Sequence, residues 1–229
     1  MKYTSRSQKM EEYNQKYPIR TSDVDALVER MLRDYLADQK KPEKVIAKAR
    51  EKALQIINHR EYETIQILMY EYPFKTDRPR TYRGHTWSPG AAENKSYFHK
   101  ALKKINKVLK LINTPGEIEI EAYLEMPTHV PPDEVILFET KLMKPVDKPD
   151  YDNIGKCYTD MFTWILTVDD DIFWRGEIRK YYSLLPRVHI MIRYLKKHES
   201  DYIYRKLMAR KSIKEGIATG QIVLERLGG

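Results

Sequence analysis

Two groups of aspartates, joined by an amphipathic segment, are the residues of this chain best suited to chemistry. Asp150 and Asp152 are two positions apart, and in extended backbone such residues point to the same side. Asp152 also stands where a helix N-cap is expected, near the positive end of the helix dipole. Lys156 follows one helical turn later, and the acidic run Asp169–Asp171 comes after the amphipathic segment. A helix followed by a returning strand is expected to bring the two groups together.

Converging carboxylates repel one another near neutral pH unless a cation shares them. Oxygen ligands without His or Cys favour Mg²⁺, with Mn²⁺ as a substitute, over zinc. Such an ion can activate water, hold a scissile phosphodiester and stabilise the leaving oxygen, while a lysine neutralises developing charge. The same residues also fit a capping aspartate and a solvated acidic turn, so residue types and spacing alone leave both interpretations open.

Hydrophobic periodicity predicts the elements that must position these aspartates. Helices are expected over residues 23–40, 42–59, 91–112, 153–166 and 199–227. Strands are expected over residues 64–72, 117–126, 134–143, 173–182 and 187–194. Because the short segment Leu184-Leu185-Pro186 lies between the last two strands, we expect them to form a hairpin. The acidic run is expected to be a turn.

This order of elements predicts an α/β (α+β) fold with a mixed sheet and packed helices. We expect a core domain over residues 61–195, a basic helical N-terminal extension over 1–60 and a basic C-terminal helix over 196–229. The net charge is +8, and its positive excess lies in the two flanks around a nearly neutral middle. A basic balance favours polyanions such as nucleic acid.

Composition excludes several classes of protein. A single cysteine, Cys157, rules out an intrachain disulfide, and we expect it to be a small apolar residue on a helix face. The polar start of the chain does not resemble a signal peptide, and no apolar run approaches the ~20 residues of a membrane helix. These features predict a cytoplasmic protein. The histidines show no metal-ligand spacing and are expected to be structural: His85, His99, His129 and His189.

Two ordered motifs resemble the RusA family of Holliday-junction resolvases. The first is KPDYDNIGKCYTDMF at residues 148–162, followed by the acidic run, EIRKYY and PRVHIMI. The second lies upstream, where FKTDRPR at residues 74–80 is followed by Trp87-Ser88-Pro89. The resemblance covers about residues 63–195, and the order and spacing of the motifs agree with those of the family.

The resemblance implies roles for individual residues. Asp150 and Asp152 match the family's first two catalytic, metal-binding aspartates, and Lys156 matches its essential lysine. The third aspartate is Asp171 if the loop aligns without a gap, or Asp170 if the loop is one residue shorter; Asp171 is narrowly preferred and both stay open. Supporting roles are expected for Asn153, which fixes the turn, for Asp160, which can pair with Lys156, and for Lys180.

The resemblance also implies a Mg²⁺-dependent homodimer that places paired nicks in opposing strands of a four-way DNA junction. Candidate phosphate-binding residues are Lys75, Arg78, Arg80, Arg83, Lys144 and Lys148, together with the lysine face of helix 91–112. Tyr82 and Trp87 are expected either to stack on unpaired bases or to pack in the core. A nucleoid-associated place of action and a phage or prophage origin would fit the family.

Some features depart from the family pattern. Ile172-Phe173 stands where the family has a small residue and Gln, residues 127–148 are longer than usual, and the flanks fall outside the resemblance. Two alternatives therefore stay open. One is a non-catalytic DNA-binding or assembly protein on the same fold. The other is a nuclease for other branched DNA, such as flaps or forks.

Overall fold

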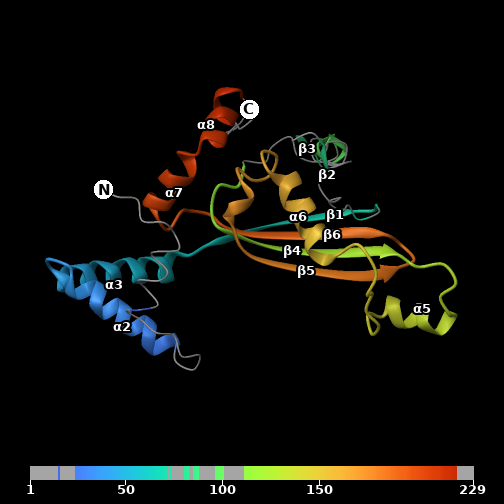
Figure 1. Cartoon of the computed structure of the whole chain (residues 1–229), viewed down its shortest axis with the longest axis horizontal. Coiled ribbons are helices and arrows are strands. Elements are labelled where there is room, and N and C mark those ends of the chain that lie inside the picture. The colour runs from blue at the N-terminus through green and yellow to red at the C-terminus, as the bar shows by residue number, and fades with distance from the viewer. Residues whose placement is uncertain are drawn as a thin grey trace. The chain divides into compact units, whose positions relative to one another are not determined.

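The structure is a computed structural model that describes residue 15 and residues 24–71, 73, 80–82, 85–87, 96–100 and 111–220. The chain divides into two compact units, Met1–His59 and Arg60–Gly229. Figure 1 gives the labels of the elements, and each unit is described by itself. None of the helices in the described ranges is both long and apolar enough to cross a membrane.

The first unit contains two amphipathic helices, α2 (Val24–Ala37) and α3 (Pro42–His59). Both were predicted from the sequence, and Pro42 occupies the first helical position, where its missing N–H costs nothing. No residue of α3 is buried. Apolar side chains of both helices stay exposed, among them Leu32, Leu54 and Ile57. The described part of this unit therefore has no closed hydrophobic core.

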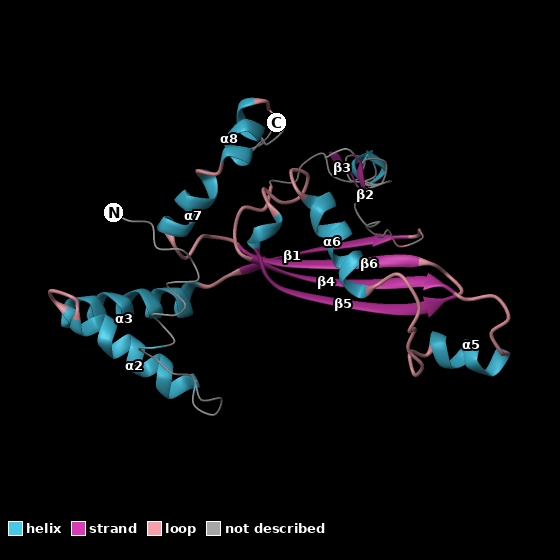
Figure 2. Ribbon diagram, viewed as in Figure 1, coloured by secondary structure: helices cyan, strands magenta, loops and turns pink. Residues whose placement is uncertain are grey.

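The second unit is built on a mixed four-stranded sheet, as the sequence predicted, with the order β1-β6-β4-β5. Its strands are β1 (Tyr62–Met69), β4 (Gly116–Glu125), β5 (Phe173–Ser183) and β6 (Arg187–Leu195). β4 and β5 run parallel, while β6 is antiparallel to both β4 and β1. The short strands β2 (Arg80–Tyr82) and β3 (His85–Trp87) form a separate antiparallel pair. Figure 2 shows the four long strands side by side.

The predicted hairpin of the last two strands is wrong, because β4 lies between β5 and β6. The chain from Ser183 to Arg187 takes four residue steps and can span about 13 Å. Two strand spacings add up to about 10 Å, so this segment is long enough to cross β4. The central place goes to β4, whose Ile118, Ile120 and Ala122 are almost completely buried. Local periodicity predicts where the strands lie but does not predict their neighbours.

The predicted strand over residues 134–143 is also wrong, since this segment contains helix α5 (Pro132–Glu139). Pro132 lies in the first turn of α5, and Asp133 and Glu134 follow it there, where acidic residues complement the helix dipole. Phe138 anchors the helix by packing edge-on against Tyr182, with ring centroids 5.1 Å apart.

The predicted single helix over residues 199–227 is two short helices within the described residues, α7 (Asp201–Met208) and α8 (Lys211–Ala218). Residues 221–229 of the prediction lie outside the described ranges. The helices separate at Arg210, which has extended backbone with φ −61° and ψ 140°. The Arg210 guanidinium forms ion pairs with Asp169 and Asp171, which belong to neither helix, at the point where the two helices separate.

Helix α6 (Tyr151–Phe162) covers one face of the sheet and follows α5 in the connection from β4 to β5 (Figure 1). Its buried face includes Ile154, Tyr158 and Cys157, which is the apolar helix residue that the sequence predicted. Gly155 marks the closest approach to the sheet, because a Cβ built there would lie 2.2 Å from Cδ1 of Ile178 in β5. The tight contact fixes α6, and with it both aspartate groups, against β5.

Candidate functional site

Asp150 and Asp152 lie at the N-terminal end of α6, and both are exposed. The predicted N-cap, Asp152, is wrong by two residues: the N-cap is Asp150, because the helix already begins at Tyr151. Asp150 has extended backbone, and its side chain makes no capping hydrogen bond. Asn153 Nδ2 donates to Asp150 Oδ2 at 3.4 Å, which supports its expected place at this turn.

Strand β5 holds the segment that leads into Asp150. Lys180 Nζ donates to the carbonyl oxygens of Asp147 and, at 3.2 Å, of Pro149. The Tyr182 hydroxyl donates to Asp147 Oδ2 at 2.7 Å. Burial, the hydrogen bond to Asp147 and the charge of Asp147 raise the pKa of Tyr182 to about 12. Lys180 therefore acts on the backbone immediately before the first aspartate pair.

The second group, Asp169–Asp171, forms the acidic loop between α6 and β5. Asp170–Ile172 make a single 3₁₀ turn, η1, and the Asp169 side chain accepts from the backbone N–H of Asp171 at 3.3 Å. One carboxylate oxygen from each of the three aspartates lies within 4.8 Å of the others. Among the described residues this is the group of acidic, His or Cys side chains whose geometry fits a metal ion.

The carboxylates of the acidic loop influence one another's ionisation. Burial raises the pKa of Asp170, and the hydrogen bond with Asp169 and the charges of Asp169, Asp171 and Asp160 raise it further. For Asp169, burial opposes ionisation, but hydrogen bonds from Asp170, the Asp171 backbone and Arg210 outweigh it and lower the pKa. The loop thus concentrates negative charge that a cation would relieve.

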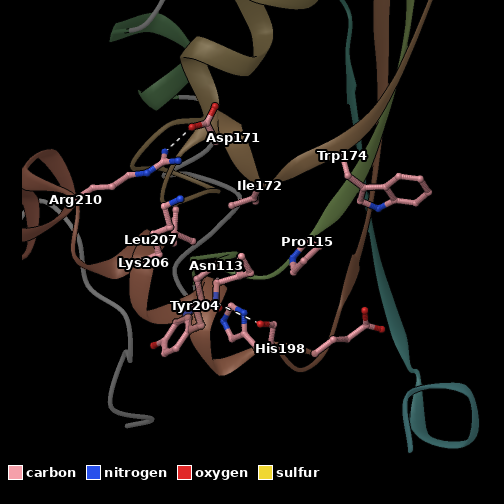
Figure 3. Close-up of a pocket in the computed structure, with 13 residues that line it drawn as sticks. Asn113, Pro115, Asp171, Ile172, Trp174, His198, Tyr204, Lys206, Leu207 and Arg210 are labelled. Atoms are coloured by element: carbon pink, nitrogen blue, oxygen red, sulfur yellow. Dashed lines mark hydrogen bonds and ion pairs between the residues drawn. The ribbon is translucent and has the colours of Figure 1, made fainter. Parts of the chain in front are cut away.

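In this structure that cation is Arg210, at the junction of α7 and α8. Its Nη1 lies 2.5 Å from Asp171 Oδ2 (Figure 3) and 3.1 Å from Asp169 Oδ2. The sequence analysis did not single out Arg210. No local motif surrounds it, and the contact depends on a return of the chain over about forty residues.

The two aspartate groups flank α6 in the chain, because Asp150 and Asp152 lie at its start and the acidic loop follows its C-terminal end. Asp152 and Asp160 are eight residues apart, which corresponds to about 12 Å along a helix axis. Asp160 is the helix residue whose charge reaches Asp170. Among the described residues, the group that could hold a metal ion consists of Asp169, Asp170 and Asp171. The assignment of both aspartate groups to one metal centre stays a prediction.

An exposed stripe runs along α6 between the two groups and consists of Asp152, Lys156 and Asp160 at intervals of four residues. The expected ion pair between Lys156 and Asp160 does not form within 4.0 Å in the structure as described. The Lys156 ammonium thus stays exposed between two carboxylates. This position is compatible with contact to a DNA phosphate along the helix.

The remaining predicted DNA contacts are only partly described. Lys144 Nζ donates to the Lys141 carbonyl and lies 5.2 Å from the centre of the Tyr181 ring, and Lys148 is exposed just before the first aspartate pair. Other predictions lie outside the described residues: Lys75, Arg78, Arg83, the side chains of Arg80, Tyr82 and Trp87, and most of helix 91–112.

Comparisons with known proteins agree with the resemblance found in the sequence. Residues 72–193, just over half of the chain, match the family described as endodeoxyribonuclease RusA. The uncharacterized protein YqaN of Bacillus subtilis (strain 168) is 26% identical over 137 residues, which cover 57% of this chain and 96% of YqaN. The family match contains both aspartate groups and Lys156, and it ends within β6. Helices α2, α3, α7 and α8 lie outside it.

Proposed function

The chain belongs to the RusA family of endodeoxyribonucleases, and we propose that it hydrolyses phosphodiester bonds of branched DNA, with the four-way junction as its main substrate. The observation that carries this proposal is the family match over residues 72–193, which contains every acidic residue of the candidate site. A net charge of +8 supports binding to a polyanion. Such a protein would act in the cytoplasm, associated with the nucleoid.

We propose that the reaction needs Mg²⁺, with Mn²⁺ as a substitute. The donors fit this choice, because the acidic loop offers three carboxylate oxygens within 4.8 Å of one another and no His or Cys. Asp150 and Asp152 supply the other proposed ligands, and Asp170 and Asp171 stay alternatives for the third position. When bound, the ion would activate water and stabilise the leaving oxygen.

The side chains of α6 have separate parts in this proposal. Asp150 and Asp152 orient the attacking water near the scissile phosphate. Asn153 donates to the Asp150 carboxylate, and Lys180 donates to the Pro149 carbonyl just before it. Lys156, exposed one turn along, binds the phosphate and offsets the negative charge that develops on it. Asp160 has a supporting part: its charge raises the pKa of Asp170 and so adds to the negative charge that a cation at the acidic loop would relieve.

We further propose that the active species is a homodimer. Two identical sites related by a dyad can address the two equivalent strands of a four-way junction, which would give paired nicks. Residues 61–195 would form the nuclease domain. The extension over residues 1–60 and the C-terminal segment 196–229 would add DNA contacts or extend the dimer interface.

One observation favours a second function, a DNA-binding or assembly protein without catalysis. Arg210 forms ion pairs with Asp169 and Asp171. The first aspartate pair lies at the other end of α6, and about 12 Å of helix separates Asp152 from Asp160. A protein that keeps this arrangement on DNA would bind a junction without cutting it. A nuclease for flaps or forks is the third alternative, and substrate comparison distinguishes it.

Cleavage of synthetic substrates tests the proposal. The full chain would be incubated with a four-way junction, a flap, a fork and a linear duplex, in Mg²⁺, in Mn²⁺ and in EDTA. We expect metal-dependent cuts in the junction, paired across opposing strands, with little cutting of linear duplex. Binding of the junction without cleavage in either metal would favour the non-catalytic alternative. Preferential cutting of flaps or forks would replace the junction as the substrate.

A further inference from the structure

A cavity of about 410 Å³ lies between the start of β5 and helix α7, next to the acidic loop. Its size is within the range of about 300–1,000 Å³ that is typical of small-molecule sites. Apolar side chains form part of its wall, including Pro115, Ile172 and Leu207. Asp171 and Arg210 line it as well, so the cavity adjoins the candidate site directly (Figure 3). The family match ends before α7 and therefore does not account for this side of the cavity.

Aromatic side chains and a histidine give the cavity its chemistry. The rings of His198 and Tyr204 stack on each other, with centroids 4.0 Å apart and planes inclined by 38°. This stacked pair is called the His198–Tyr204 platform. Nε2 of His198 is buried and has no hydrogen-bond partner among the described residues. Burial also lowers the pKa of His198, which favours the neutral imidazole. Trp174, 62% exposed, stands on the other side of the cavity.

Positive charge borders this platform. Lys206, exposed on α7, lines the cavity together with Arg210. One nucleotide matches these features, because its base fits an apolar wall, an aromatic ring face and an unpaired ring nitrogen, and its phosphate fits an adjacent ammonium group. Bases stack on aromatic side chains whatever their sequence, and lysines bind the backbone phosphates.

We propose that this cavity binds one unpaired nucleotide of a DNA strand, with the base on the His198–Tyr204 platform and the adjoining phosphate at Lys206. The inference rests on the proposed function, since it takes DNA as the ligand. It goes further by assigning a specific subsite to the C-terminal segment. Branched DNA offers unpaired bases at its branch point, and a captured base would place the neighbouring phosphodiester beside the acidic loop.

Binding of DNA in EDTA tests this subsite without any dependence on cleavage. The full chain would be titrated with a duplex that carries one unpaired 2-aminopurine and with the fully paired duplex, and the base fluorescence would be followed. We expect tighter binding of the unpaired substrate and quenching of the base. Tyr204→Ala should weaken this binding about thirtyfold, at the middle of the range for loss of one stacked base, and leave the paired duplex unaffected.

A neighbour on the same helix provides the matched control. Tyr202, 72% exposed, does not line the cavity, so Tyr202→Ala should bind like the wild type. Tyr204→Phe keeps the ring and should retain most of the affinity, which separates stacking from general damage to the fold. Lys206→Gln should weaken binding of the unpaired substrate more than Lys214→Gln on α8.

Three results would overturn the proposal: equal binding of the two duplexes by the wild type, equal effects of the Tyr204 and Tyr202 changes, or the same quenching with free 2-aminopurine deoxynucleotide as with the strand. The last would identify a pocket for free nucleotides. Failure of the proposed nuclease function would appear separately, as absence of cleavage in Mg²⁺ with binding in EDTA intact.

Discussion

Replacement of Arg210 by glutamine should strengthen metal binding at the acidic loop. Arg210 pairs with Asp169 and Asp171, two of the three acidic-loop carboxylates whose geometry fits a divalent ion. An ion that binds all three aspartates must displace the guanidinium or share its partners. Arg210→Gln removes the competing charge and retains a side chain of similar length that can still donate a hydrogen bond.

The structure sets the size of this effect. A charge pair at about 4 Å is worth ~4 kcal/mol at an effective dielectric constant of 20. Here the side chains of Arg210 and Asp171 are 39% and 61% exposed, so solvent screening reduces each pair to the ~0.2–1 kcal/mol of surface ion pairs. Together the two pairs contribute about 1 kcal/mol. We therefore expect Arg210→Gln to lower the dissociation constant for Mn²⁺ about fivefold.

Titration of the DNA-free protein with Mn²⁺, followed by calorimetry or electron paramagnetic resonance, measures this constant directly. Arg205→Gln is the control, since Arg205 is an exposed arginine of α7 for which the structure gives no ion pair with the acidic loop. It should leave the constant unchanged. Equal or weaker Mn²⁺ binding by Arg210→Gln would refute the competition between guanidinium and metal.

Three further changes test the packing and electrostatics around the site. Gly155→Ala would place a methyl group 2.2 Å from Ile178 Cδ1. We therefore expect the unfolding free energy, measured by urea denaturation, to fall by about 1–3 kcal/mol. An unchanged denaturation midpoint would contradict the close approach of α6 to β5. Lys180→Met removes the donor to the Pro149 carbonyl and should slow junction cleavage while junction affinity measured in EDTA stays the same, whereas a parallel loss of both would indicate a DNA contact instead. Burial opposes ionisation of Glu121, but a hydrogen bond from Tyr123, the charge of Lys141 and contacts with Arg179 outweigh it and lower its pKa from 4.5. The resulting stabilisation is present above the pKa of the unfolded state and is lost as pH falls through the pKa of the folded state. Glu121→Gln should therefore destabilise the protein at pH 7 but progressively less below about pH 4.5. A difference in unfolding free energy between variant and wild type that stays constant with pH would contradict this assignment.

Local patterns predicted the elements better than their arrangement. The strand expected over residues 117–126 is β4, because Ile118, Ile120 and Ala122 alternate with polar residues and face the core. The hairpin of β5 and β6 could not be judged locally, since the insertion of β4 between them is a contact between distant segments. The apolar run Val135–Phe138 resembles a strand by composition. It forms a helix instead, and Pro132 and the acidic residues that follow it favour a helix start.

The candidate site shows the same limit. The motif at residues 148–162 identifies Asp150, Asp152 and Lys156 as candidates, because their types and spacing are local. The separation of the two aspartate groups follows from the length of α6, which the sequence had already predicted as a helix of more than three turns. Arg210 and the cavity at α7 could not be predicted, since they arise where a distant segment returns to the acidic loop.

The most direct test of the central claim is the single-turnover rate of four-way junction cleavage in Mg²⁺ by the wild type and Asp152→Asn. Asp133→Asn, which changes another exposed aspartate in the first turn of a helix, is the matched control. The proposed mechanism predicts cleavage by the wild type and the control, and a loss of at least a hundredfold in Asp152→Asn with junction affinity in EDTA retained. Equal cleavage by all three proteins would contradict the assignment of the active site to the start of α6.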